Sequence, residues 1–66
     1  MNIKINGKAM DVGRACTLDG LLDLVGVKRQ GIAVELNREI VPKRLHGETT
    51  LKDGDSVEIV RMVGGG

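Results

Sequence analysis

The chain has 66 residues, of which 41% are hydrophobic and 29% charged, and its net charge is +1. This length allows one small domain, and the composition indicates a globular fold rather than a disordered chain. The even charge balance argues against nucleic-acid binding. The sequence has no Phe, Tyr or Trp on which bases would stack, so the core is expected to be aliphatic.

Cysteine usage and hydropathy predict where the protein works. Its single cysteine, Cys16, excludes an internal disulfide, and no Cys/His cluster suggests a structural metal. A free thiol suits a reducing compartment better than secretion. No segment approaches the roughly 20 apolar residues of a membrane span, and residues 1–5 lack the apolar run of a signal peptide. We therefore expect a soluble, cytoplasmic protein with no membrane partner.

The N-terminal segment predicts a β-hairpin. Apolar residues alternate with polar ones over residues 1–5, as in a strand with one buried face. Asn6-Gly7 is the strongest short signal for a two-residue hairpin turn, because both of its positions need positive φ. Residues 8–12 are then expected to return as a second strand. Met1, Ile3 and Ile5 are predicted to share the buried face of the first strand, and Met10 and Val12 to share one face of the second.

One helix is predicted after this hairpin. The Thr17 hydroxyl can cap its start, and Gly26 is suited to the left-handed conformation that ends a helix. Between them the apolar residues recur at the spacing of one helical face, which is expected to pack on a sheet. This face consists of Leu18, Leu21, Leu22 and Val25.

The second half predicts further strands. Residues 32–36 alternate again, and residues 40–41 form a short strand that Pro42 ends. Residues 43–50 are polar apart from Leu45, which we expect to anchor this loop to the core. A tight turn at residues 51–55 leads into the last strand, residues 56–63. There Val57 and Ile59 share one face, and Val60 and Met62 share the other.

These elements predict an α+β fold in which one helix packs on a sheet. The order is typical of the ubiquitin-like roll, the β-grasp, with a mixed sheet of four to five strands. We expect a single domain over residues 1–66, with residues 63–66 as a flexible tail. Periodicity leaves the pairing order of the strands open. The predicted core places Leu22 with Ile3, Ile5, Leu18, Val34, Val57 and Ile59.

A catalytic constellation is not evident in the sequence. His46 is the only histidine, and we expect a solvated loop residue there rather than an acid–base catalyst. Cys16 is expected to be a passive, half-buried thiol, since no neighbouring base is evident. The basic pairs Lys28-Arg29 and Lys43-Arg44 are either solvated loop charges or contacts for an acidic partner. No phosphate-binding loop or Ser/His/Asp set occurs.

The C-terminal sequence Met62-Val63-Gly64-Gly65-Gly66 has three interpretations: a frayed end, an artificial linker, or an arm whose useful group is its carboxylate. Bare glycine backbone can enter a channel too narrow for side chains. Its carboxylate is ionised at neutral pH and does not acylate other groups by itself. A partner that adenylates it with ATP would make AMP the leaving group, and the acyl carbon would then accept sulfur or an amine.

The whole chain resembles the ThiS family, the sulfur-carrier proteins of thiamin biosynthesis. The matching stretches are "MNIKINGK", "TLDGLLDLVGV", "IAVELNREIVPKR" and "LKDGDSVEIVRMVGGG". The resemblance implies a β-grasp carrier, not an enzyme, that binds no cofactor itself. Gly65 and Gly66 match the terminal diglycine of the family, and Gly64 is one glycine more than the motif needs.

The resemblance also implies partners. An E1-like adenylyltransferase of the ThiF type would adenylate Gly66 with ATP. A sulfur donor would then convert the adenylate to a thiocarboxylate, and thiazole synthase of the ThiG type would take the sulfur. We predict that partners dock on the exposed sheet face near the tail, with Val60, Met62 and Gly64 in contact and Lys43 and Arg44 at the rim.

Three alternatives remain at this point. The small subunit of molybdopterin synthase shares the fold and the diglycine, but usually has aromatic and proline residues before its tail. A ubiquitin-like protein modifier would use the same activated carboxylate. From a different class, the chain would be a binding module without activity, and its glycines a remnant.

Overall fold

The structure is a computed structural model that describes residues 1–14 and 16–62. Over these residues the chain forms a β-sheet, one α-helix and one short 3₁₀ turn. The elements in chain order are β1 (Asn2–Ile5), β2 (Lys8–Asp11), α1 (Leu18–Val25), β3 (Ile32–Leu36), β4 (Glu39–Ile40), η1 (Lys43–Leu45) and β5 (Ser56–Arg61).

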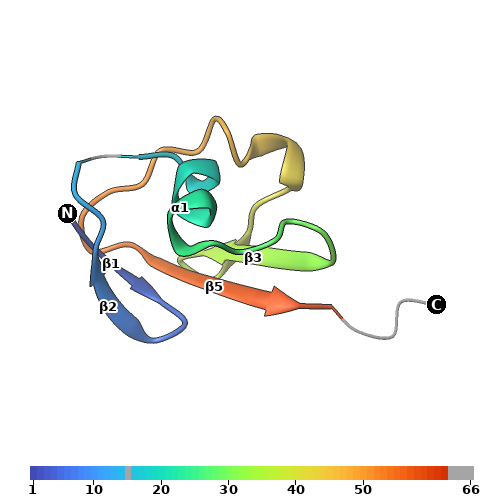
Figure 1. Cartoon of the computed structure of the whole chain (residues 1–66), viewed down its shortest axis with the longest axis horizontal. Coiled ribbons are helices and arrows are strands. Elements are labelled where there is room, and N and C mark those ends of the chain that lie inside the picture. The colour runs from blue at the N-terminus through green and yellow to red at the C-terminus, as the bar shows by residue number, and fades with distance from the viewer. Residues whose placement is uncertain (15, 63–66) are drawn as a thin grey trace.

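The five strands form one mixed sheet in the order β2-β1-β5-β3-β4. β1 pairs parallel with β5, whereas the pairs β1–β2, β3–β5 and β3–β4 are antiparallel. The helix α1 covers one face of the sheet (Figure 1). The predicted α+β layer pair is therefore confirmed, and the pairing order places the first and last strands of the chain side by side at the centre.

Both predicted helix caps are present. The Thr17 hydroxyl accepts a hydrogen bond from the Gly20 amide at 3.1 Å. Gly26 adopts the left-handed conformation with φ 73°, and its amide donates to the carbonyl oxygens of Asp23 and Leu22. These bonds satisfy backbone groups that a helix end otherwise leaves without partners. The sequence between the caps therefore forms a helix of eight residues, too short to be stable without its packing on the sheet.

The hydrophobic core lies between α1 and the sheet. Its fully buried members are Ile3, Leu18, Leu21, Leu22, Val34, Leu51 and Val57. Ile5 and Ile59, which the sequence also assigned to the core, are half-buried and pack against it. Leu51 is an addition, because alternation does not single out one apolar residue beside a turn. Its amide donates to the Cys16 carbonyl oxygen at 2.9 Å, which holds it beneath the start of α1.

The loop after β4 corrects two predictions. His46, expected to be solvated, is 5% exposed, whereas Leu45, the expected anchor, is only half-buried and is absent from the core cluster. The His46 imidazole Nε2 lies 3.0 Å from the Val41 carbonyl oxygen. The His46 carbonyl oxygen accepts from the Asp19 amide at 3.0 Å. Hydrogen bonding to both sides therefore draws the histidine inward, which a count of hydrophobic residues does not predict.

The second strand of the hairpin differs slightly from its prediction. It ends at Asp11 rather than at residue 12. Met10 is 40% exposed, whereas Val12 is half-buried. β2 lies at the edge of the sheet, beyond the area that α1 covers. The turn itself is as predicted, because Asn6 and Gly7 both have positive φ, at 51° and 85°.

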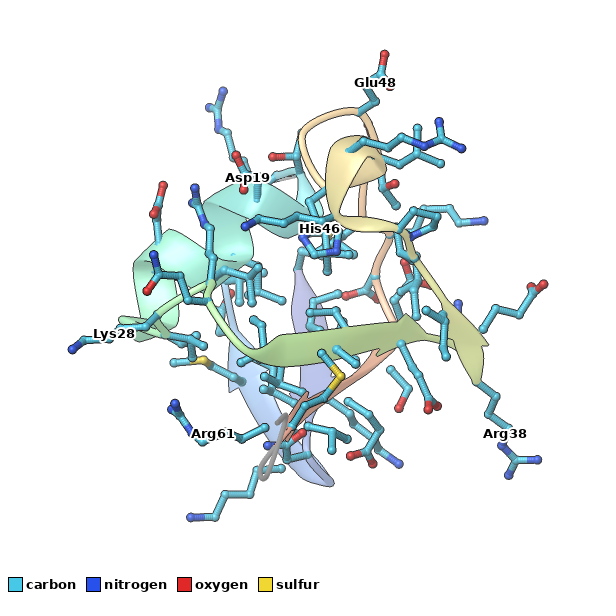
Figure 2. All side chains as sticks on the ribbon, turned by 90° about the vertical axis from the view of Figure 1, so that its right-hand side faces the viewer. Asp19, Lys28, Arg38, His46, Glu48 and Arg61 are labelled. Atoms are coloured by element: carbon cyan, nitrogen blue, oxygen red, sulfur yellow. The ribbon has the colours of Figure 1, made fainter. Side chains whose placement is uncertain are left out.

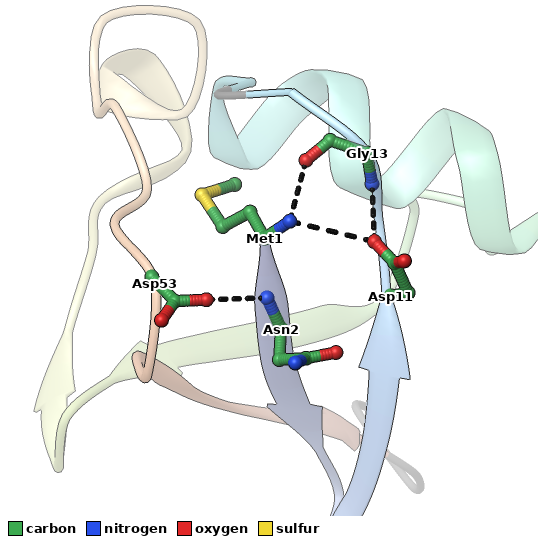
Figure 3. A network of polar contacts seen from close by, with 5 residues as sticks. All are labelled: Met1, Asn2, Asp11, Gly13 and Asp53. Carbon is green, nitrogen blue, oxygen red and sulfur yellow. Dashed lines mark hydrogen bonds and ion pairs between the residues drawn. The ribbon is translucent and has the colours of Figure 1, made fainter.

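The N-terminus is tied to the end of the molecule away from the tail. The Met1 ammonium donates to the Gly13 carbonyl oxygen at 2.8 Å and lies 3.4 Å from the Asp11 carboxylate (Figure 3). Asp11 also accepts from the Gly13 amide, and Asp53 accepts from the Asn2 amide at 2.6 Å. The hydrogen bond from Gly13 and the nearby ammonium lower the pKa of the Asp11 carboxyl group.

We predict that Leu22→Ala largely unfolds the protein. Leu22 is fully buried between α1 and the sheet, and truncating such a leucine costs about 2–5 kcal/mol. This loss approaches the whole free energy of unfolding of a small domain. Thermal melting followed by circular dichroism measures it. Leu24→Ala is the matched control, because Leu24 lies on the same helix and is 58% exposed. Equal melting of both variants would contradict the assigned helix face.

We predict that Asp11→Asn lowers stability near neutral pH but not in acid. A lowered pKa in the folded state means that the carboxylate stabilises the fold above its unfolded pKa of about 3.9, and that this contribution disappears as the pH falls through the folded pKa. The melting temperatures of variant and wild type should therefore converge on acidification. Glu48→Gln, at an exposed carboxylate with no ion pair to the described residues, should show no such convergence.

Candidate functional site

The site proposed from the sequence begins where β5 leaves the fold. β5 is the central strand, so β1 holds it on one side and β3 on the other. Beyond Arg61, the Met62 amide donates to the Gly31 carbonyl oxygen at 2.7 Å. Figure 1 shows β5 directed away from the N-terminal end of the molecule. Gly64, Gly65 and Gly66 lie outside the described residues.

Gly31 shapes this tail root, which we define as Gly31, Arg61 and Met62. Gly31 has φ 69°, a conformation that residues with a side chain rarely adopt. A Cβ built on it would lie 3.8 Å from the Met62 carbonyl oxygen, an ordinary contact distance. The glycine is therefore required by its backbone conformation rather than by a lack of space. Through it, the connection after α1 reaches the strand that carries the tail.

An exposed apolar surface lies on the sheet face opposite α1. Val60 pairs with Ala33 on β3 and is 49% exposed, and Met62 is 60% exposed. Ile40 on β4 pairs with Glu35, and alternation along β3 places Glu35 on the same face as Ala33. Ile40 is 68% exposed and was not among the predicted contacts. The sequence did carry a signal for it, because Ile40 and the half-buried Val41 are adjacent and must point to opposite faces.

Two carboxylates lie on this outer face. Glu35 on β3 is directly opposite Glu58 on β5, and neither forms an ion pair with another residue that the structure describes. Like charges in directly opposed positions destabilise a sheet. Lys4 on β1 is exposed on this face too, since it alternates with Ile3 and Ile5 and pairs with Ser56. The outer face therefore combines apolar side chains with charges of both signs.

Lys43 and Arg44 lie elsewhere. Both are exposed in η1, in the loop that hydrogen-bonds to the start of α1 through the His46 and Thr49 carbonyl oxygens. In Figure 1 this turn stands on the helix side of the sheet. The structure therefore brings Val60 and Met62 together but does not place Lys43 and Arg44 beside them. Whether these four residues contact a partner stays a prediction.

The two residues of the other basic pair, Lys28 and Arg29, have different surroundings. The Arg29 guanidinium lies 3.1 Å from the Asp19 carboxylate and 2.6 Å from the Asp23 carboxylate, and it also donates to the Asp19 carbonyl oxygen. Arg29 thus connects the chain after α1 to the exposed side of the helix. Lys28 is exposed and has no ion pair with the described residues.

The described residues offer little internal chemistry. They contain no group of three His, Cys, Asp or Glu side chains placed to hold a metal ion, and they enclose no pocket. Cys16 is half-buried, as predicted. Residues 1–14 and 16–62 also include no helix long and apolar enough to cross a membrane.

Comparisons with known proteins agree with this architecture. The crystal structure of a thiamine biosynthesis protein (ThiS) from Geobacter metallireducens superposes with a TM-score of 0.86 and 36% identity over the full length of both chains. This match confirms the predicted ubiquitin-like β-grasp. The sulfur carrier protein ThiS of Bacillus subtilis is 37% identical over 68 residues, covering 97% of this chain and 98% of that protein.

A third relative is larger. The chain is 41% identical over its full 66 residues to a thiazole synthase of Paramagnetospirillum magneticum, but it spans only 20% of that protein's length. The model of the ThiS family matches residues 3–66, which is nearly the whole chain. The chain therefore belongs to the ThiS family.

Proposed function

We propose that this protein is a sulfur carrier of thiamin biosynthesis and that the carboxylate of Gly66 carries the sulfur. The observation that supports this most directly is the family match, which continues through the terminal glycines to Gly66. The fold supports it as well, because the central strand β5 leads directly into these glycines. The protein would thus be a substrate of other enzymes rather than an enzyme.

The proposed chemistry takes place in two steps. A carboxylate oxygen of Gly66 attacks the α-phosphorus of ATP, which forms an acyl adenylate and releases pyrophosphate. A sulfur nucleophile then attacks the acyl carbon, and AMP leaves with the former carboxylate oxygen. With sulfide as the nucleophile, the product is a thiocarboxylate directly. With a persulfide, the product is an acyl disulfide, and a reducing thiol must cleave its S–S bond to leave the thiocarboxylate. ATP is bound by the activating partner, so the carrier needs no cofactor of its own.

The tail suits this role because of what it lacks. Residues 64–66 have no side chain, so a partner can enclose the backbone in a narrow channel and hold the carboxylate at a defined position. Such positioning accounts for a large part of enzymatic rate enhancement. Gly65 would lie inside this channel, and Gly64 would stand nearer its entrance.

Three partners follow from this proposal: an E1-like adenylyltransferase of the ThiF type, a sulfur donor, and a thiazole synthase of the ThiG type. The last is supported by relatives named thiazole synthase, in which a segment similar to this chain forms about a fifth of the protein. We propose that docking uses Val60 and Met62, joined by Ile40, with Lys43 and Arg44 as peripheral contacts. The free thiol of Cys16 supports a cytoplasmic location.

We predict that deleting Gly66 abolishes the transfer of sulfur to the C-terminus, which we call charging, without changing the fold. The deletion removes no residue of the core, so the melting curve should be unchanged. The carboxylate would be drawn back by roughly 3.5 Å, and a displacement of even 1 Å can cost about a hundredfold in rate. The measurement is intact mass after incubation with ATP, adenylyltransferase and sulfur donor, which detects replacement of one oxygen by sulfur.

Two further variants test the channel separately from the length of the tail. Gly65→Val keeps the carboxylate in place but introduces a side chain that a narrow channel excludes. An alanine added after Gly66 moves the carboxylate forward instead. Both variants should accept no sulfur although they fold normally. Charging of the deleted or extended chain at the wild-type rate would show that the tail is not the working group.

We predict that Cys16→Ser is charged normally under reducing conditions. The proposed route places sulfur on the Gly66 carboxylate, so no internal thiol takes part. Cys16 is half-buried beside α1, and serine preserves its approximate size. Intact mass after the charging reaction, together with a melting curve, gives the answer. A Cys16→Ser variant that folds but accepts no sulfur would transfer the chemistry to this thiol.

A further inference from the structure

Two cations flank the tail root. Lys28 lies in the connection between α1 and β3, and Arg61 is the last residue of β5. Both are exposed, and neither forms an ion pair with any residue in the described part of the chain. Figure 2, which looks at the right-hand side of the molecule in Figure 1, shows both on the same side of the view. Arg29, between them in sequence, is by contrast occupied by two aspartates.

Backbone pairing joins the segment that follows Lys28 to the end of β5. The Met62 amide donates to the Gly31 carbonyl oxygen at 2.7 Å, and Arg61 pairs with Ile32. The segment that carries Lys28 is thus joined to the strand that carries Arg61 within a few residues of both. Neither side chain contributes to the core. Their charges are therefore available to a partner at the point where the tail leaves the fold.

The charged residues of β5 nearest the tail root, Glu58 and Arg61, lie on opposite faces of the sheet. Arg61 alternates with Val57 and Ile59 along β5, so it belongs to the helix side of the sheet. Glu58, and Glu35 opposite it, belong to the other side. A glycine tail has no side chain by which a partner could recognise one side of it. The positive side of the root, in contrast, distinguishes one rotational orientation of the carrier from the others.

The length of the tail determines whether Lys28 and Arg61 can contact the nucleotide. The four residues 63–66 span at most roughly 13 Å when extended, and the nucleotide reacts at their far end. Side chains at the near end therefore do not contact the phosphates while the tail is extended in a channel. They meet the protein surface at the mouth of that channel instead.

We propose that Lys28 and Arg61 dock against carboxylates at the mouth of the tail channel of the adenylating partner. The proposal rests on the proposed function and adds the chemistry of the partner's surface: acidic on the side that faces α1. Complementary charge of this kind steers association and fixes orientation more than it adds affinity. Lys28 and Arg61 are docking residues in this scheme, and the chemical step does not depend on them.

The experiment uses the full-length carrier, a purified E1-like adenylyltransferase and ATP, with pyrophosphate release measured against carrier concentration. Lys28→Glu and Arg61→Glu replace attraction by repulsion at an exposed site, so we expect KM for the carrier to rise roughly three- to tenfold. The kcat should change little. Added salt should raise the KM of the wild type but have a weaker effect on the variants.

Two matched controls carry the same change of charge elsewhere. Arg14→Glu lies in the loop beside the N-terminus, at the other end of the molecule. Lys8→Glu lies on the hairpin opposite Ile5, whose neighbour on β5 is Val57, four residues before Arg61. That separation is roughly 13 Å along the strand, beyond the screening length of about 8 Å in physiological salt. Both controls should keep the wild-type KM, and melting curves should show all four variants folded.

The outcomes separate the two proposals. A KM that rises only for Lys28→Glu and Arg61→Glu supports the acidic channel mouth. Equal KM values for all four variants would overturn it, while normal charging of the wild type would leave the proposed function intact. A lower KM for the two variants would also overturn the proposal of an acidic channel mouth, because Lys28 and Arg61 would then weaken binding to the partner. If the wild type itself releases no pyrophosphate, the proposed function fails, and the docking proposal fails with it.

Discussion

The central position of β5 is the constraint on which the rest of the structure depends. Its parallel partner is β1, so the two ends of the sequence lie side by side. The Lys4 amide donates to the Asp55 carbonyl oxygen and the Asn6 amide to that of Val57, each at 2.9 Å. This pairing closes nearly the whole chain between β1 and β5 into a loop. Loop closure costs conformational entropy, which the shared core must offset. In return the strand that leads to the tail is held on both sides.

Features set by short-range patterns could be predicted from the sequence. The hairpin turn at Asn6-Gly7 and the caps of α1 depend on residues that are neighbours in the chain. The strand pairing could not be predicted, because periodicity identifies a buried face without its neighbour. The burial of His46 was missed for a related reason, because the loop that carries it is joined to α1 by a hydrogen bond from the Asp19 amide, 27 residues earlier. Its ring bonds to the nearer Val41 carbonyl oxygen. With Nε2 donating to Val41, its Nδ1 has no partner among the described residues.

The candidate site likewise has features that the sequence predicts and features that only the structure shows. Alternation along the last strand correctly assigned Val60 and Met62 to an exposed face and Val57 to the core. The pairing of the segment after Lys28 with the end of β5 could not be predicted, since it joins Met62 to a glycine 31 residues earlier. Composition showed two adjacent basic residues at 28 and 29. Only the structure shows that Asp19 and Asp23 form ion pairs with Arg29, whereas Lys28 forms none with the described residues.

In the proposed function the carrier reacts at its own terminus, so the chemistry does not require a pocket in the fold. Its specificity must therefore come from its outer surface and from the geometry of the tail root. The outer sheet face offers apolar area together with carboxylates, and the opposite side of the root offers cations. Because the glycine tail has no side chains, we propose that a partner uses this difference between the two sides to orient the carrier before the carboxylate reaches the nucleotide. In this proposal the fold contributes orientation, and the partner contributes the chemistry.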